Sequence, residues 1–255
     1  MGAPAQHDLP TENTAFRARA RVERYDREGN QAFYRAAMVR LLDGALSLTG
    51  RGLDLGCGTG ISTEVLLEKV PRVDWQGVDC AQAMLNLARR KPSLAGVEFH
   101  HARAEELPLG DHSFDVVVAN FAWHWFGEGA GAEVRRVLRP GGWLLASVPL
   151  RRFSRVAGNR ALAAFLLSDR QAFTRLRSQG FRFEDVPALL PGPVRVARHE
   201  LFCQTESFAD GSQLLDVLDS RGALVAIFGE RAPKTLQTPS PVDFEWPFAI
   251  LHAQV

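Results

Sequence analysis

The sequence contains few cysteines, and none of them is placed to form a disulfide or to bind a structural metal. Cys57, Cys80 and Cys203 are the three cysteines, and no two of them form a C-x-x-C pair. A disulfide framework or a zinc site needs clustered Cys or His side chains. The spacing therefore argues against both, predicts no metal site, and fits the reducing conditions of a cytoplasmic location.

The sequence also lacks a charge excess and any long hydrophobic run. Lys and Arg total 30 against 29 Asp and Glu, so the net charge of +1 gives no general attraction to nucleic acid or to an anionic membrane. No apolar run approaches the roughly 18 residues that a membrane span needs. Residues 1–14 are polar and lack the apolar segment of a signal peptide. We expect a soluble protein with neither a nucleic-acid nor a membrane partner.

Apolar runs and helical periodicity alternate along the chain in the order typical of a doubly wound sheet. A helical cap is predicted at residues 16–48, before the first strand. Strands are predicted at 51–56, 73–79, 97–101, 114–120 and 143–149, with helices between them at 62–70, 82–90 and 133–138. This alternation predicts an α/β fold with a Rossmann-like parallel sheet.

Beyond residue 150 the sequence predicts an insertion and two further strands. Two arginine-rich helices are expected within 152–182, a strand at 194–205, a helix at 212–221 and a last strand at 244–253. The sheet would then have seven strands. We divide the chain into a tail and cap at 1–48, a core at 49–150, and the insertion with the sheet edge at 151–255, all within one structural domain.

The most informative motif is a glycine loop that follows the first strand directly. Gly56, Gly58 and Gly60 stand at every second position, and Asp54 precedes them near the carboxyl end of the strand. A dinucleotide fingerprint has the different spacing G-x-G-x-x-G and binds a pyrophosphate. The spacing here favours a ligand with a sulfonium and an amino acid, whose ammonium Asp54 would meet. Glycine allows the close backbone approach.

Asp79 ends the second strand, where open α/β sheets bind their ligands. A carboxylate at this position can accept hydrogen bonds from the two hydroxyl groups of a ribose. Asp54 and Asp79 would serve only as strand-end or helix-capping groups in the alternative interpretation, and Cys57 is expected to be a small residue in a tight loop.

These residues and four later motifs together resemble the class I S-adenosylmethionine-dependent methyltransferases, of methyltransferase domain type 11. The motifs are Asp54 to Gly60, Asp79 with Met84, Ala104-Glu105-Glu106-Leu107-Pro108, Asp111-His112-Ser113-Phe114-Asp115, and Val137 to Gly142. The resemblance covers roughly residues 16–149. It implies a seven-stranded sheet whose last strand is antiparallel, and S-adenosyl-L-methionine as the cofactor.

The resemblance also implies which residues bind the cofactor. Gly56, Cys57, Gly58 and Gly60 would hold the methionine portion with Asn120 beneath it, Asp79 and Cys80 the ribose, and Met84, Ala104 and Glu105 the adenine. Many relatives have Asp where this chain has Arg103, so the adenine contact would fall to the backbone of Ala104 or to Glu105.

The acceptor site is less defined by the sequence. His124 and Trp125 follow the fourth strand in an aromatic run, where His124 would contact the acceptor or act as a base, or would simply pack among the rings. Tyr25 and Phe33 of the cap would close over the cofactor as a lid, or pack as ordinary helix residues. The catalytic residue, if any, is left unassigned.

Two features favour a carboxylate acceptor. The cap and the order of the C-terminal elements resemble the malonyl-acyl carrier protein O-methyltransferases. Eight arginines lie between 151 and 182 against Asp169 alone, and Arg152 and Arg155 among them would hold a substrate carboxylate or dock an acidic acyl carrier protein. The alternatives are a solvated helix face, a free small acid or a quinone as acceptor, an NAD-dependent oxidoreductase, and a pseudoenzyme that binds the cofactor without turnover.

Overall fold

A computed structural model describes residues 16, 19–45, 47–152, 154–179, 181–228 and 232–255, so the polar tail at 1–14 lies outside the described residues. Its sheet has seven strands in the order β3-β2-β1-β4-β5-β7-β6. Strands β1 to β5 pair in parallel, while β7 runs antiparallel to both β5 and β6. The strands are β1 Gly50–Leu55, β2 Val73–Asp79, β3 Glu98–His101, β4 Phe114–Asn120, β5 Leu138–Pro149, β6 Arg195–Phe208 and β7 Val242–Gln254. The prediction of a Rossmann-like sheet with an antiparallel last strand is confirmed.

Helices cover both faces of this sheet because alternate strand residues point to opposite sides. In β4, Val116 and Val118 pack with α2 (Glu28–Leu41) and α3 (Ile61–Lys69) on one face. Val117 and Ala119 pack with α5 (Ala130–Val137) on the other. A nearly continuous apolar strand is therefore buried on both sides.

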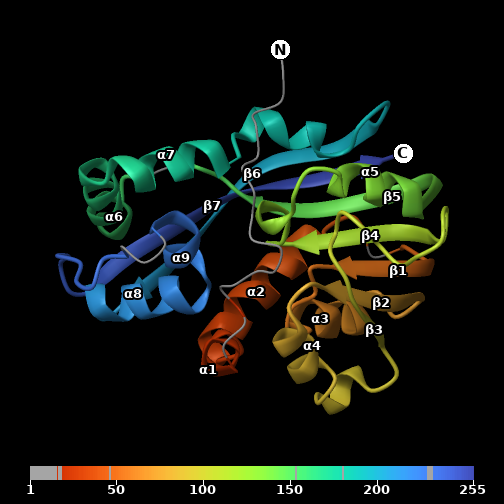
Figure 1. The fold of residues 1–255 in the computed structure, drawn as a ribbon, viewed down its shortest axis with the longest axis horizontal. Helices are drawn as coiled ribbons and strands as arrows, with labels where there is room; N and C mark the ends of the chain where they lie inside the picture. The colour runs from red at the N-terminus through yellow and green to blue at the C-terminus, as the bar shows by residue number, and fades with distance from the viewer. Residues whose placement is uncertain (1–15, 17–18, 46, 153, 180, 229–231) are drawn as a thin grey trace.

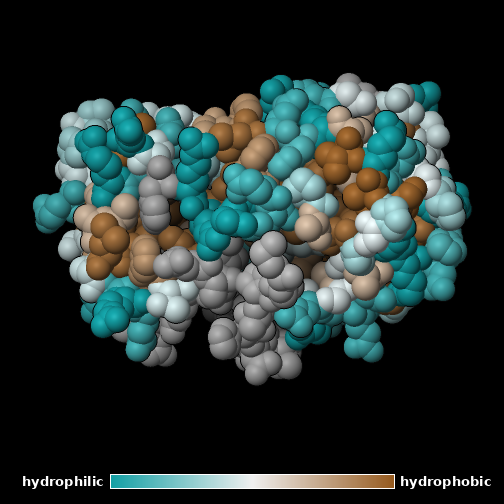
Figure 2. All heavy atoms as spheres, turned by 90° about the horizontal axis from the view of Figure 1, so that it is seen from above, coloured by the Kyte–Doolittle hydropathy of each residue, from teal (hydrophilic) through white to brown (hydrophobic). Residues whose placement is uncertain are grey.

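The outer ends of β6 and β7 extend beyond the other strands and carry a second hydrophobic cluster (Figure 1). We call this part the outer lobe; it consists of these strand ends with α6 Ala157–Ser168, α7 Arg170–Gln179, α8 Gly211–Ser220 and α9 Ala223–Phe228. Leu162, Leu214 and Phe244 lie in its core, and each is at least nine-tenths buried. Figure 2, viewed from the α6 and α7 side, shows many hydrophilic residues on this lobe with hydrophobic ones between them.

The cap differs from the single predicted helix. It consists of α1 (Arg19–Tyr25) and α2, and the chain between them bends at Arg27, which has extended dihedral angles of φ −67° and ψ 154°. In Figure 1, α1 and α2 lie between the outer lobe and the helices α3 and α4 (Gln82–Ala88). The break therefore leaves a short turn, residues 26–27, beside the core.

Two other details also differ from the sequence-based expectation. Strand β5 begins at Leu138, five residues early, because the predicted turn at residues 140–142 is an irregularity within the strand, with Gly141 at φ 81°. Helix α9 was not predicted.

Among the described residues no helix is long and apolar enough to span a bilayer, and no group of three or more His, Cys, Asp or Glu is placed to hold a metal.

Candidate functional site

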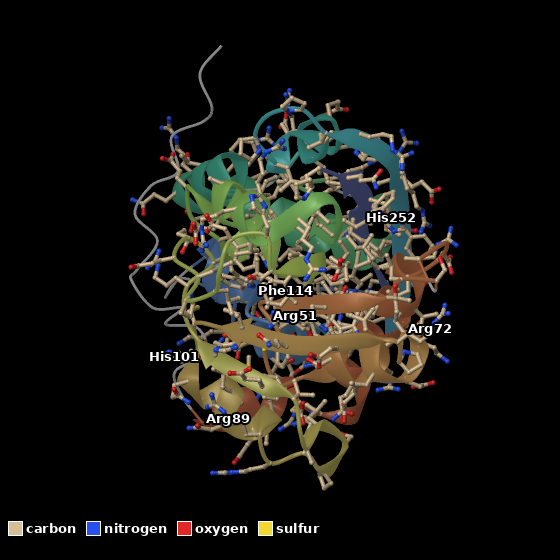
Figure 3. The ribbon with its side chains drawn as sticks, turned by 90° about the vertical axis from the view of Figure 1, so that its right-hand side faces the viewer. Arg51, Arg72, Arg89, His101, Phe114 and His252 are labelled. Carbon is tan, nitrogen blue, oxygen red and sulfur yellow. The ribbon has the colours of Figure 1, made fainter. Side chains whose placement is uncertain are left out.

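The candidate site lies at the carboxyl edge of the parallel strands, where β1, β2 and β4 end beside one another. Gly77 and Val78 of β2 pair with Asp54 and Leu55 of β1. Asp79, the last residue of β2, pairs with His101 at the end of β3. In Figure 3, His101 is well separated from Arg72, which precedes β2 at the opposite edge. Loops that leave neighbouring parallel strands at one edge form the usual ligand site of such a sheet.

The glycine loop is held against β2 by backbone hydrogen bonds. The N–H groups of Gly56 and Cys57 donate to the carbonyl oxygen of Val78 at 2.8 and 3.0 Å. A Cβ on Gly56 would lie 2.5 Å from the Cβ of Ala122, and one on Gly60 would lie 2.3 Å from Leu94, so close packing requires glycine at both. A Cβ on Gly58 would meet nothing within 4 Å. Gly58 therefore borders open space in which a ligand could approach the backbone.

Asp79 connects this loop to the end of β2. Its carboxylate oxygens accept hydrogen bonds from the N–H groups of Gly58 at 2.8 Å and Ala81 at 2.7 Å. Burial raises the pKa of the Asp79 carboxyl above its ordinary value. Each oxygen keeps a second lone pair, which is the capacity that two ribose hydroxyls require. Cys80, the next residue, is half-buried.

Asp54 is buried with one of its oxygens unsatisfied. Its Oδ2 accepts a hydrogen bond from the Thr63 hydroxyl at 2.7 Å, whereas Oδ1 has no partner. The side chain is 1% exposed, and burial raises its pKa to about 7. A buried polar atom without a partner is costly, so a cationic ligand group that pairs with it would stabilise the site. Together with the open space at Gly58, this fits a cofactor that carries an ammonium group.

Asn120 is a junction of four elements. Its Nδ2 donates to the Tyr34 carbonyl of α2 at 3.2 Å and to the Ser62 hydroxyl of α3 at 2.9 Å. Its Oδ1 accepts from the Ser147 hydroxyl of β5 at 2.7 Å. The next residue, Phe121, has the left-handed φ of 51°, which turns the chain away from the strand. Asn120 thus fixes the loop after β4 relative to the cap and the glycine-loop helix.

The side predicted to hold adenine is built around Glu105. Its Oε2 accepts from Arg103 Nε at 3.0 Å, and its Oε1 accepts a short hydrogen bond from the N–H of Gly127. Each oxygen thus accepts one hydrogen bond from the protein and keeps a second lone pair, so Glu105 and the backbone of the buried Ala104 both remain candidates for the adenine contact. Met84 is 3% exposed and packs with residues of the cap.

Tyr25 and Trp125 flank Phe16, and His124 lies against Trp125. The Phe16 ring lies edge-on to Tyr25 and to Trp125, with centroid distances of 5.4 and 5.9 Å. His124 packs against Trp125 at 4.8 Å, its Nδ1 is buried without a partner, and burial lowers its pKa to about 4. The imidazole is therefore neutral at physiological pH and only weakly basic.

The sequence-based prediction missed a buried cation on the other side of Tyr25. Arg221, 6% exposed, forms a bidentate pair with Glu206 and lies over the Phe33 ring, 3.9 Å from its centroid. Trp246 faces the same guanidinium at 4.7 Å. The antiparallel pairing of β6 with β7 brings Glu206 and Trp246 together, while Arg221 reaches them from the end of α8 and Phe33 from α2. No local motif could have identified them.

The structure does not bring Arg152 and Arg155 into this cluster. Both side chains are exposed on the segment that follows β5, and no hydrogen bond or ion pair joins them to the described residues around Asp79 or His124. Arg175 and Arg177 have side chains outside the described part of the chain. The two exposed arginines therefore lie at the surface and not among the buried residues of this cluster.

Comparison with known proteins gives a consistent family. Residues 53–146 match a family model described as a methyltransferase domain. A phthiotriol/phenolphthiotriol dimycocerosates methyltransferase of Mycobacterium tuberculosis is 30% identical over 204 residues, which are 69% of this chain and 71% of that protein. A malonyl-[acyl-carrier protein] O-methyltransferase of Methylococcus capsulatus is 33% identical over 167 residues, or 60% of this chain and 61% of that protein.

One more relative is similar over a shorter stretch of the sequence, and one solved structure is similar in fold. A fatty-acid O-methyltransferase of Mycolicibacterium smegmatis is 34% identical over 115 residues, or 44% of this chain and 42% of that protein. The solved structure of a SAM dependent methyltransferase from Aquifex aeolicus covers 93% of this chain and 99% of that one, with a TM-score of 0.57 and 15% identity. This last likeness describes the fold.

Proposed function

The chain belongs to the S-adenosylmethionine-dependent methyltransferases with this methyltransferase domain, and we propose that it methylates a carboxylate oxygen. Malonyl-acyl carrier protein is the first substrate to test. The cofactor, when bound, supplies a methyl carbon activated by a sulfonium. Gly56 to Gly60 and Asp54 would hold its methionine portion, Asp79 its ribose, and Met84 with Ala104 or Glu105 its adenine. The remaining question is the nature of the acceptor.

The observation that carries this proposal is the low basicity of His124. An alcohol or a phenol must lose a proton to a base during attack, whereas a carboxylate arrives ionised. When its oxygen bonds to the methyl carbon, the carbon–sulfur bond breaks and no proton moves. A histidine with a pKa of about 4 is a poor base but suits a site where none is needed. Its imidazole can still donate a hydrogen bond that positions the acceptor.

Two tyrosines of the cap, Tyr25 and Tyr34, agree with this chemistry. The hydroxyl groups of Tyr25 and Tyr34 hydrogen-bond to each other, and their rings are 5.1 Å apart. Burial raises the pKa of both phenols above the ordinary value, most strongly for Tyr25. Both phenols therefore remain protonated at neutral pH, so neither supplies the base that an alcohol or phenol acceptor would need.

The relatives and the arginines support a carrier-bound acceptor. Malonyl-[acyl-carrier protein] O-methyltransferases are among the relatives, and a fatty-acid O-methyltransferase is another enzyme whose name gives an acid as the acceptor. Arg152 and Arg155 are exposed after β5, at the strand edge that carries the site. Such cations steer an acidic carrier protein toward a site more than they hold it there.

A methyl-transfer assay tests the proposal directly. Malonyl-acyl carrier protein, free malonate, free fatty acids and quinones are incubated with the cofactor, and release of S-adenosylhomocysteine is measured for each. We expect turnover with a carboxylate, and a base-labile methyl ester as the product. Turnover with quinones alone would reject the carboxylate, and binding of the cofactor without any turnover would support the pseudoenzyme.

The docking role is tested by charge reversal. In R152E/R155E we expect kcat/KM for the malonyl-carrier protein to fall about tenfold or more, with free malonate unaffected. The matched control is R72E/R90E, which makes the same charge change at exposed arginines outside the segment after β5. Equal losses in the two double variants would show a general charge effect and reject docking at Arg152 and Arg155.

A further inference from the structure

The turn between α1 and α2 contacts the glycine loop through Asp26. The Oδ1 of Asp26 accepts a hydrogen bond from the Thr59 hydroxyl at 2.6 Å and another from Lys91 Nζ at 2.9 Å. The Lys91 and Asp26 side chains are only 14% and 15% exposed. One carboxylate oxygen thus joins the cap, the glycine loop and the segment after α4. Charge-assisted hydrogen bonds of this kind are the stronger ones in proteins.

Asp26 is itself held in place by the start of α2. Gln31 Nε2 donates to the Asp26 carbonyl oxygen at 2.6 Å and lies 3.4 Å from its Oδ2. Lys91 also approaches Glu64 of α3 at 3.6 Å, so the cation is shared between two carboxylates. Gln31 and Lys91 therefore orient the Asp26 carboxylate that accepts the hydrogen bond from Thr59.

Thr59 is the point at which this network reaches the site. It lies between Gly58 and Gly60, both of which have left-handed φ values, and its side chain is 1% exposed. Two glycines make a backbone easy to deform, so its geometry depends on the groups that fix it. The N–H of Gly58 is fixed by Asp79, and the hydroxyl of Thr59 by Asp26.

We propose that Asp26 is a positioning residue for cofactor binding: through the Thr59 hydroxyl it holds the glycine loop in its binding geometry and couples that loop to closure of the cap. The adjacent Tyr25 is half-buried and packs against the cluster that includes Ala81, whose N–H donates to Asp79. The same turn therefore contacts both the loop and the surroundings of the second-strand carboxylate. Opening of the turn releases the loop and uncovers the bound cofactor.

Two substitutions at Thr59 separate this role from packing. Thr59→Val keeps the buried shape and removes the hydroxyl, whereas Thr59→Ser keeps the hydroxyl. In calorimetry with S-adenosylmethionine and S-adenosylhomocysteine, we expect T59V to raise both dissociation constants about tenfold and T59S to leave them within about twofold. The dissociation rate should account for most of the loss.

Coupling is tested with Asp26→Ala and the double variant. If Asp26 acts through Thr59, D26A/T59V binds the cofactor no more weakly than the weaker single variant, since both substitutions remove the same contact. The control is Asp219→Asn, which removes an ion pair between α1 and α8 without touching the loop. D219N should bind the cofactor more tightly than D26A.

Three results would overturn the proposal: affinity unchanged in T59V, equal loss in T59V and T59S, or losses in D26A and T59V that add independently. Thermal unfolding of each variant without ligand shows whether the fold is kept. No acceptor enters these measurements, so they are independent of whether the substrate is a carboxylate.

Discussion

Asp54 has an unusual chemical state among the residues of the site. Its Oδ1 is buried without a hydrogen-bond partner, and its pKa of about 7 lies well above the ordinary value of 3.8. Burial disfavours the charged form, and the single hydrogen bond from Thr63 compensates only in part. In the unliganded protein this carboxyl is therefore close to half-ionised near neutral pH. A cation that binds beside it would favour the ionised form.

This state predicts pH-dependent cofactor binding. The ammonium group should bind the ionised carboxylate, which becomes scarce below pH 7. The dissociation constant should therefore rise about fivefold between about pH 7 and about pH 6. Calorimetry over this interval gives the slope, and Asp54→Asn should bind more weakly with a flat profile. The same slope in D54N would assign the titration to another group.

The ionisation of Asp54 also changes the free energy of unfolding. Because the pKa of Asp54 in the folded chain lies above its value in the unfolded chain, the charged form is disfavoured in the fold. Its contribution to the unfolding free energy is lost as the pH rises from about 4 through about 7. The protein should thus be less stable at neutral than at weakly acidic pH by this term. D54N should lack this loss in urea unfolding.

His124 gives a separate prediction at the residue scale. His124→Phe keeps a ring against Trp125 and removes the nitrogen that has no partner. Since a carboxylate acceptor needs no base, kcat should stay within about threefold of the wild-type value, and stability should not fall. A loss of a hundredfold or more in steady-state kinetics would identify His124 as a general base and favour an alcohol or phenol acceptor.

At the scale of elements, α1 is attached to α8 by a row of ion pairs. Arg21 and Arg24 pair with Asp219 at 3.0 and 2.8 Å, and Arg24 also pairs with Asp216. Arginines three residues apart share one face of a helix, so α1 presents them together to α8. The cap is thereby held between the outer lobe and the glycine loop.

This attachment predicts a salt-sensitive cap. The double substitution D216N/D219N should weaken cofactor binding by about two- to threefold, since exposed pairs contribute little individually. We also expect its affinity to depend less on ionic strength than the affinity of the wild type. Hydrogen exchange should be faster in α1 and unchanged in α5, which makes no contact with this row. Unchanged exchange in α1 would show that other contacts hold the cap.

Elements with a continuous local pattern could be predicted from the sequence, whereas those set by distant contacts could not. Strand β4 matches its predicted bounds because an apolar run that is buried on both faces leaves little choice of register. Strand β2 also matches, although it contains the polar residues Asp74 and Gln76. Asp54 and Asp79 were predicted to share a site because both stand near the carboxyl ends of parallel strands. The break at residues 26–27 has no glycine or proline to mark it, and tertiary contacts of Asp26 set it. The Arg221–Glu206 pair depends on how α8 packs back against β6, which local patterns do not encode.

At the scale of the whole molecule, two hydrophobic cores share one pair of strands. The core around the sheet and the core of the outer lobe both include residues of β7, namely Phe248 and Phe244.

We propose that the chain unfolds as one cooperative domain. Leu214→Ala, at a fully buried site of the outer lobe, should then lower the unfolding free energy by about 2–5 kcal/mol in a single transition. Leu167→Ala, at a position 72% exposed, is the control and should change little. Two separate calorimetric transitions would show that the lobe unfolds alone.

The central claim is that the backbone around Gly58 lies against the methyl donor. Gly58 and Gly44 both have left-handed φ values, 56° and 80°, and a Cβ at either position meets nothing within 4 Å. Gly58→Leu and Gly44→Leu thus impose a similar backbone strain, but only the first fills the proposed cradle. In calorimetry of protein stripped of bound ligand, we predict that G44L binds S-adenosylmethionine like the wild type and that G58L shows no measurable binding. Wild-type affinity in a folded G58L would contradict the account.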